Sequence, residues 1–286
     1  MKFAIVGAGS VGTAIAYASL IQGLGDHVVL YDRNGAKATA EMLDLRHGLQ
    51  FVPAAQVDGG DDISLCAHAD IVVITAGAKQ RPGQTRLELA AANASITSDI
   101  VPNLLELAPH ALLLFVTNPV DVVTFVAQEA AAVGGVDPAR IIGSGTVLDT
   151  SRLRFLLAER LGVAVSSVHA TIVGEHGDSE IALWSSATVG GAPLAVADDE
   201  LGSLLHEVRT AAYRIIEGKG ATNLAIGLAT ARILRAIEGD EHSVLPVSAR
   251  HDVPGVGEIC FSLPTIVGRR GVIRTLDVPP VSYTHL

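Results

Sequence analysis

The stretch from Val173 to Glu180, which reads VGEHGDSE, holds the side chains best suited to acid–base chemistry. His176 stands close to two glycines, and carboxylates lie on both sides of it. Glycine allows a close approach of backbone or of a small ligand, and histidine titrates near neutral pH, so His176 is predicted to be an acid/base group. The alternative is a glycine-rich turn that carries a surface histidine. The other motifs of the chain are needed to choose between an acid/base histidine and a surface histidine.

The bulk composition limits the fold class. The chain has 286 residues, more than most single domains, which predicts two lobes. Its residues are 49% hydrophobic but only 4% aromatic, so the core must be built from Ala, Val, Leu and Ile. Such a core is typical of parallel strands covered by helices on both faces.

The charge and the cysteines exclude several classes of partner. A formal net charge of -10 argues against a nucleic-acid or membrane partner, because both favour a basic protein surface. An anionic substrate must therefore meet a local group of arginines. Cys66 and Cys260 have neither metal-ligand spacing nor the number needed for a disulfide framework. We expect both to be small core residues in the reducing cytoplasm, with no metal site.

The uncharged segment 3–25 has to be weighed as a membrane span or a signal peptide. The glycines at 7, 9, 12, 23 and 25 interrupt it and disfavour a lipid-facing helix. The pattern instead predicts a strand over 2–6, a turn GAGSVG over 7–12 and a helix from Val11 toward Ile21. The glycines permit the tight turn, and they allow backbone N–H groups to approach a pyrophosphate at the helix N-terminus.

An acidic residue follows the next predicted strand. Asp32 comes directly after the run 27–31, twenty residues beyond Gly12. A carboxylate at this place can accept hydrogen bonds from the ribose hydroxyls of a dinucleotide, and it would repel a 2′-phosphate. The pattern therefore predicts NAD rather than NADP.

Strands and helices alternate through the first half of the chain. Apolar runs at 69–77 and 112–119 are predicted strands that end in polar turns, and helical periodicity covers 36–49 and 87–107. This alternation predicts a doubly wound parallel sheet of the Rossmann type, whose carboxyl edge faces a ligand. The polar segment 79–86 between the two strands is either a loop that closes over a substrate or an ordinary surface loop.

The composition shifts from strand and turn toward helix near Gly143, which sets the predicted domain boundary. Residues 1–143 form the predicted dinucleotide-binding domain, and residues 144–286 form the predicted α+β catalytic domain. Asp149 and Arg152 are three residues apart on the helix that follows, so they share one face. They are either a functional pair or a plain surface ion pair.

The second half is predicted to contain one strand, two helices and a set of antiparallel strands. The predicted ranges are 168–173 for the strand, 200–218 and a segment ending at Glu238 for the helices, and 243–272 for the antiparallel strands. The sequence KGAT at 219–222 is predicted to cap the first of these helices.

Eight motifs in this order resemble the lactate/malate family of 2-hydroxy-acid dehydrogenases, over residues 2–273. They are the glycine turn, Asp32, the loop 80–86, TNPVD at 117–121, GSGT at 143–146, Asp149 with Arg152, GEHGD at 174–178 and KGAT at 219–222. A coincidence of all eight motifs is improbable. The alternatives given above for single motifs, which are a glycine-rich turn, an ordinary surface loop and a surface ion pair, are therefore disfavoured. The resemblance implies a Rossmann NAD-binding domain, a catalytic domain, and hydride transfer between NAD and a 2-hydroxy acid.

The resemblance also implies a role for individual residues. His176 is expected to donate a proton to the ketone oxygen, Asp149 to orient and stabilise its imidazolium, and Arg86 to polarise the carbonyl. Arg152 is expected to hold the substrate carboxylate in a bidentate ion pair. The other implied substrate-binding residues are Gln80, Asn118, Asp121 and Thr222, and the implied cofactor-binding residues are Gly7, Gly9, Val11, Gly12, Asp32, Lys37, Gly77, Ala78, Thr117 and Asn118.

Gln80 occupies the position that separates substrates in this family, where malate dehydrogenases carry arginine. A neutral glutamine would leave the second carboxylate of oxaloacetate unpaired, so pyruvate and lactate are the implied substrates. If the loop register slipped by one, Arg81 would take that place and oxaloacetate would fit better. A malate or other 2-hydroxy-acid dehydrogenase is therefore one alternative, and a NAD-binding protein without turnover is another.

Arg154 and His169 fall where the bacterial members of the family that respond to fructose 1,6-bisphosphate place phosphate-binding cations between subunits. The resemblance implies a homotetramer activated by this sugar bisphosphate, with activation fading as pH rises and His169 loses its proton. The alternative is an exposed arginine and a structural histidine.

Two segments depart from the family's pattern. Asn223-Leu224 stand where the family usually has two tyrosines, which changes the expected wall of the pocket. The chain also stops without the family's final amphipathic helix, and residues 281–286 resemble a translated sequencing adapter. We therefore expect a truncated chain whose last residues are non-native and whose assembly is weakened.

Overall fold

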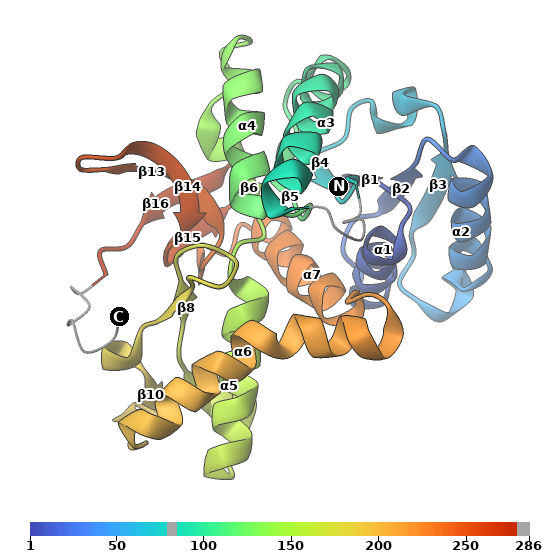
Figure 1. The fold of residues 1–286 in the computed structure, drawn as a ribbon. Helices are drawn as coiled ribbons and strands as arrows, with labels where there is room; N and C mark the ends of the chain where they lie inside the picture. Colours follow the sequence, from blue (N-terminus) through green and yellow to red (C-terminus); the bar gives the residue numbers. More distant parts are fainter. Residues whose placement is uncertain (79–84, 279–286) are drawn as a thin grey trace.

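A parallel sheet forms the centre of the computed structural model, which describes residues 1–78 and 85–278 (Figure 1). Its parallel strands are β1 (Lys2–Val6), β2 (His27–Tyr31), β3 (Gln56–Gly60), β4 (Ile71–Ile74), β5 (Leu112–Phe115) and β6 (Ile141–Gly143). Their spatial order is β6-β5-β4-β1-β2-β3, so the winding reverses between β1 and β4. This order confirms the doubly wound sheet expected from the sequence.

Helices cover both faces of this sheet. Alternate strand residues face opposite sides, so that Phe3 and Ile5 belong to one core and Ala4 and Val6 to the other. The helices are α1 (Ser10–Gln22), α2 (Gly35–His47) and α7 (Leu224–Glu238) on the first face, and α3 (Arg86–Leu107) and α4 (Val120–Ala132) on the second. Because α7 comes from the second half of the chain, the first core is not built from the first half alone.

Two antiparallel strands from the second half extend the same sheet beyond β6. β13 (Ser248–Val253) pairs with β6 through Ser248 and Gly143, and β14 (Gly257–Ser262) pairs with β13. The packing at this join is close, because a Cβ atom on Gly143 would lie 2.9 Å from the Cβ of Ser248. The antiparallel strands were expected, whereas their place in the first sheet was not. The division of the chain at Gly143 stays a prediction.

The remaining elements form a third core and three small sheets. The helices are α5 (Val147–Leu161) and α6 (Asp198–Lys219), and the strands are β7 (Val168–His169), β8 (Ile172–Val173), β9 (Ile181–Ala182), β10 (Thr188–Val189), β11 (Ala192–Pro193), β12 (Ser243–Leu245), β15 (Thr265–Gly268) and β16 (Gly271–Thr275). The single strand expected over 168–173 is two strands. β7 pairs with β10 and β8 pairs with β9, so the chain changes partner between them.

Local sequence signals explain where two helices begin and end. α3 begins at Arg86 because Thr85 and Glu88 form a capping box. α6 ends at Lys219 and is capped by Gly220, whose φ of 81° is left-handed, which confirms the cap expected over 219–222. The predicted substrate-selecting Gln80 and the terminal segment 281–286 lie outside the described residues.

A search of the described helices, including the one formed from segment 3–25, finds none that is long and apolar enough to cross a membrane.

Candidate active site

The glycine turn lies between β1 and α1, at the carboxyl edge of the sheet. Gly7 has a φ of 109°, and a Cβ atom on Gly12 would lie 1.9 Å from the carbonyl oxygen of Gly7. A side chain at Gly12 would therefore fill the space that lets α1 approach the strand. Gly9 precedes α1 and Val11 lies in its first turn.

Asp32 follows β2 and is held beside this turn. Its Oδ2 accepts a hydrogen bond from the Ala8 backbone N–H at 2.9 Å, and its Oδ1 accepts one from the Asn34 N–H, also at 2.9 Å. Lys37 of α2 lies on the same side, because its Nζ is 4.0 Å from a Cβ built on Gly9. The turn, the carboxylate and the lysine thus form a cradle that fits the phosphates and ribose of a dinucleotide.

The predicted nucleotide residues after β4 and β5 are joined by a residue that the sequence analysis missed. Asn93 of α3 is buried; its Oδ1 accepts from the Ala78 N–H at 2.6 Å, and its Nδ2 donates to the Asn118 carbonyl at 2.7 Å. Thr117 Oγ1 adds a hydrogen bond to the Ala76 carbonyl at 2.8 Å. A Cβ atom on Gly77 would lie 2.5 Å from Thr117, so these two loops are in close contact. The sequence feature that could have identified Asn93 is its polar side chain within the predicted helix 87–107.

His176 lies against a buried carboxylate from α5. Its Nδ1 is 2.6 Å from Asp149 Oδ2, and Arg152 Nη1 is 2.8 Å from Asp149 Oδ1. The Asp149 side chain is 3% exposed and that of Arg152 is 14% exposed, so this is not a surface ion pair. The structure therefore brings together the three residues that the sequence separated by as many as 27 positions.

The charges in this cluster shift the pKa values of both partners. Burial alone would lower the pKa of His176, but the charge and hydrogen bond of Asp149 outweigh it, so the pKa lies above its ordinary value. Burial alone would raise the pKa of Asp149, but the neighbouring His176 and Arg152 hold it below its ordinary value. With Nδ1 engaged by Asp149, Nε2 is the ring nitrogen that can exchange a proton with a ligand.

Asp121, which was predicted to bind substrate, lies behind His176. Its Oδ2 accepts from the His176 backbone N–H at 2.9 Å, and its Oδ1 accepts from Ser248 Oγ at 2.5 Å. Burial raises the pKa of Asp121, and these two hydrogen bonds oppose the rise. One oxygen holds the backbone of His176 and the other is engaged by Ser248 of β13, so the geometry favours a positioning role, and contact with substrate stays a prediction. No local sequence pattern identifies Ser248, because its position beside Asp121 depends on the pairing of β13 with β6.

Arg86 is paired at the rim of the cluster. Its Nη2 lies 2.8 Å from Asp178 Oδ2 and donates to the hydroxyl of Tyr213 on α6. The side chain of Arg86 is 61% exposed. The structure thus ties the start of α3 to the loop that carries His176. Tyr213 was not singled out from the sequence.

Thr222 and Asn118 approach the same edge from opposite halves of the chain. Thr222 lies, half-buried, between the Gly220 cap and α7, and Asn118 is exposed after β5. The neighbouring Asn223 accepts a hydrogen bond from Lys219 Nζ at 2.6 Å, and its Nδ2 lies 3.5 Å from the Ser10 carbonyl. The turn after α6 therefore lies next to the glycine turn.

Comparison with known proteins identifies the family. Residues 1–143 match the model of the lactate/malate dehydrogenase NAD-binding domain, and residues 146–284 match that of its alpha/beta C-terminal domain. The chain belongs to the lactate/malate dehydrogenase family. The first half of this family member accordingly carries an NAD-binding domain, and the cradle around Gly12 and Asp32 fits that cofactor.

Several relatives are similar over nearly the whole chain. An L-lactate dehydrogenase of Bifidobacterium animalis subsp. lactis is 46% identical, over 97% of this chain and 89% of the relative. One from Thermus aquaticus is 48% identical, over 96% and 91%. A crystal structure of a minor L-lactate dehydrogenase from Enterococcus mundtii in a ligand-bound form superimposes with a TM-score of 0.94 at 40% identity, over 99% of this chain and 92% of that one.

The two predicted effector residues of this family member lie on neighbouring elements. Arg154 is on α5, and its Nε donates to the Ala170 carbonyl at 2.8 Å, next to the exposed His169 at the end of β7. Burial lowers the pKa of Arg154. The structure therefore places the guanidinium of Arg154 beside the backbone that directly follows His169.

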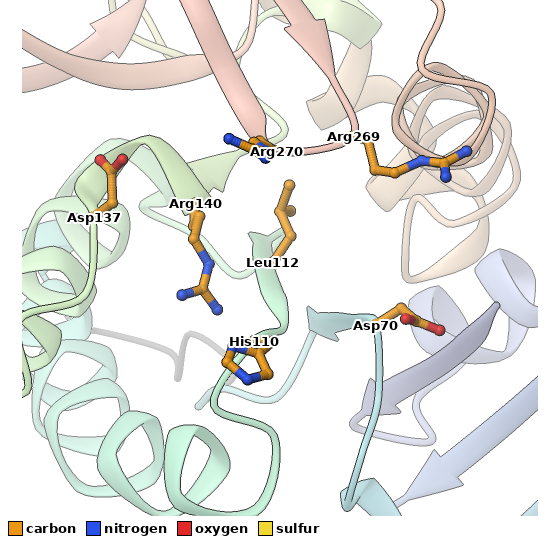
Figure 2. Close-up of a pocket in the computed structure, with 7 residues that line it drawn as sticks. All are labelled: Asp70, His110, Leu112, Asp137, Arg140, Arg269 and Arg270. Carbon is orange, nitrogen blue, oxygen red and sulfur yellow. The ribbon is translucent and has the colours of Figure 1, made fainter.

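A separate pocket of about 350 Å³ lies at the other edge of the sheet (Figure 2). Asp70 precedes β4, Leu112 opens β5 and Arg140 precedes β6, so the pocket is at the amino ends of the parallel strands. None of the predicted site residues that lie in the described ranges lines it. The chemistry of this family member is therefore expected at the carboxyl edge instead.

Proposed function

We propose that this chain is an NAD-dependent L-lactate dehydrogenase that interconverts pyruvate and (S)-lactate. The observation that carries the proposal is the buried Asp149, which pairs with His176 on one oxygen and with Arg152 on the other. This arrangement provides an acid/base group and a fixed cation within one small site. The relatives named L-lactate dehydrogenase support the same activity.

Bound NAD supplies the hydride acceptor and, when reduced, the hydride donor for the reaction. The residues proposed to hold it are those of the glycine turn with Asp32 and Lys37, together with Gly77, Ala78, Thr117 and Asn118. Asp32 faces the turn through its bond to Ala8, where it can accept from ribose hydroxyls and disfavour a 2′-phosphate. We also propose a functional division near Gly143, with cofactor contacts before it and acid/base chemistry after it.

His176 is proposed to give a proton from Nε2 to the ketone oxygen during reduction and to take it back during oxidation. Asp149 holds the opposite nitrogen, so it orients the ring and stabilises the imidazolium. Its buried position strengthens this effect, because the local dielectric constant is lower than that of water.

Arginines are proposed to hold and polarise the substrate. The guanidinium of Arg152 uses Nη1 for Asp149 and has further N–H groups with which to bind the substrate carboxylate in a bidentate pair. Arg86, at the rim beside Asp178, is proposed to polarise the carbonyl and stabilise its developing charge. Asn118, Asp121 and Thr222 complete the proposed substrate site.

The direct test is the oxidation of NADH with pyruvate and with oxaloacetate, measured side by side. A preference for pyruvate supports the proposal and the assignment of Gln80 as the selecting residue. A preference for oxaloacetate would instead indicate a malate dehydrogenase with Arg81 facing the substrate. Binding of NADH without turnover of any ketoacid would indicate an inactive NAD-binding protein.

We further propose a cytoplasmic homotetramer activated by fructose 1,6-bisphosphate at Arg154 and His169. Large apolar side chains on adjoining α1 and α7 support an assembly, because Tyr17 is 57% exposed and Leu228 is 58% exposed. Light scattering tests the tetramer. Assays at pH 6 and pH 8, each with and without the sugar bisphosphate, test the effector. Equal rates with and without the sugar bisphosphate at pH 6 would contradict the effector site.

A further inference from the structure

Glu180 is a buried carboxyl group that the proposed roles leave unused. It lies directly before β9, and only 2% of its surface is exposed. Its Oε1 is buried and has no hydrogen-bond partner among the described residues. A buried carboxylate without such partners is strongly disfavoured, so the side chain is not explained by a structural hydrogen bond.

The carboxyl group lies beside the proposed proton-transfer pair. One oxygen of Glu180, one oxygen of Asp149 and one ring nitrogen of His176 are all within 4.8 Å of one another. The oxygens of Asp149 are already engaged, Oδ2 by His176 and Oδ1 by Arg152. Glu180 is therefore a second carboxyl group that lies close enough to act on the imidazole through its charge when it is ionised.

Charged groups from three helices face Glu180 and His176. They are Asp121 of α4, Asp149 and Arg152 of α5, and Arg209 of α6, whose guanidinium also donates to the backbone carbonyl of Glu180. Burial, followed by the charge of Asp149, raises the pKa of Glu180 to about 8, although His176, Arg209 and Arg152 oppose the rise. The carboxyl group is thus protonated at neutral pH, and it ionises at mildly alkaline pH.

We propose that Glu180 is a positioning residue whose buried carboxyl, next to Asp149 and His176, titrates together with the imidazole and sets the pH range over which His176 is protonated. Ionisable groups this close to each other titrate as a coupled pair. A negative charge on Glu180 stabilises the imidazolium, so His176 keeps its proton to a higher pH than Asp149 alone would give. The inference rests on the proposed role of His176.

The pKa of His176 can be measured without turnover. Its ring signal is followed by NMR in the NADH-bound protein and is identified by its loss in His176→Gln. Glu180→Gln keeps the shape of the side chain but cannot ionise. We expect it to lower the pKa of His176 by about one unit, a roughly tenfold smaller imidazolium fraction on the alkaline side. The alkaline limb of kcat/KM for pyruvate should move to lower pH by a similar amount.

Two further variants make the result decisive. Glu207→Gln removes the same charge from an exposed position on α6, and it should leave the pKa of His176 unchanged. Glu180→Met places an uncharged side chain of similar length in the buried position and should act like Glu180→Gln. An unchanged pKa of His176 in either folded Glu180 variant overturns the inference. Failure to reduce any ketoacid would contradict the proposed function instead, while the NMR titration would still test Glu180.

Discussion

Asp149 is a single buried side chain that serves two partners. The carboxylate of Asp149 is only 3% exposed, and it is stable here because one of its oxygens pairs with His176 and the other with Arg152. The surrounding charges keep the pKa of Asp149 low and raise that of His176. The environment of Asp149 therefore contributes directly to the acid/base behaviour of His176.

Replacing Asp149 by asparagine should abolish most of this effect. An amide cannot stabilise the imidazolium, so kcat/KM for pyruvate is expected to fall on the order of 10²- to 10⁴-fold. Because the raised pKa of His176 is lost, the remaining activity should decline at a lower pH than in the parent protein. Steady-state kinetics across pH measure both effects, and NADH fluorescence serves as the binding control. A pH profile equal to that of the parent would contradict the role of Asp149.

The cysteines should be inert in the folded protein. Burial is the main cause that raises the pKa of Cys66 to about 11 and that of Cys260 to about 12. Only the thiolate is nucleophilic, so at pH 8 neither side chain should react with iodoacetamide until the chain unfolds. Mass spectrometry counts the modified thiols, and urea-unfolded protein, in which both cysteines should react, is the control. Labelling of the native protein would mean that these side chains are not held in the core.

At the scale of elements, the nucleotide edge depends on how closely α1 approaches β1. The close approach is possible because Gly12 has no side chain, whereas Gly9 faces more open space. The two glycines of the same turn therefore have different physical requirements, although the sequence pattern treats them alike.

Gly12→Ala should disrupt this contact. The new Cβ would lie 1.9 Å from the Gly7 carbonyl oxygen, so the backbone must move. We expect a loss of about 1–3 kcal/mol in the free energy of unfolding, together with weaker NADH binding. Gly9→Ala is the matched control, because its Cβ meets only Lys37 Nζ at 4.0 Å and the φ of Gly9 is -78°. Chemical denaturation of both variants separates them, and equal stabilities would refute the packing argument.

At the scale of the whole molecule, the site is assembled across both halves of the chain. Asp121 of α4 holds the backbone of His176 and accepts a hydrogen bond from Ser248, 127 residues away. β13 and α7 likewise complete the sheet and the core of the first half. The two halves are therefore expected to unfold together.

Ser248→Ala tests this connection. The substitution leaves the partly buried Asp121 without one of its donors, which should cost about 1–3 kcal/mol of stability. It should also lower kcat more than it weakens NADH binding, because His176 is positioned through Asp121. Ser186→Ala, whose hydroxyl donates only to the Leu183 carbonyl within its own turn, is the control. An effect on NADH binding alone would place Ser248 in the cofactor site instead.

The sequence alone was enough to predict the strand–turn–helix around Gly12, the acidic residue after β2, the cap at Gly220 and the doubly wound sheet. These features depend on spacing within a few residues or on the period of one element, which local sequence records directly. Only the tertiary structure decided the partners of Asp121, the role of Asn93 in joining two loops, the pairing of Arg86 with Tyr213 and the burial of Glu180. Such contacts join residues far apart in the chain, and they depend on which strands pair and how the helices pack, so no local pattern specifies them.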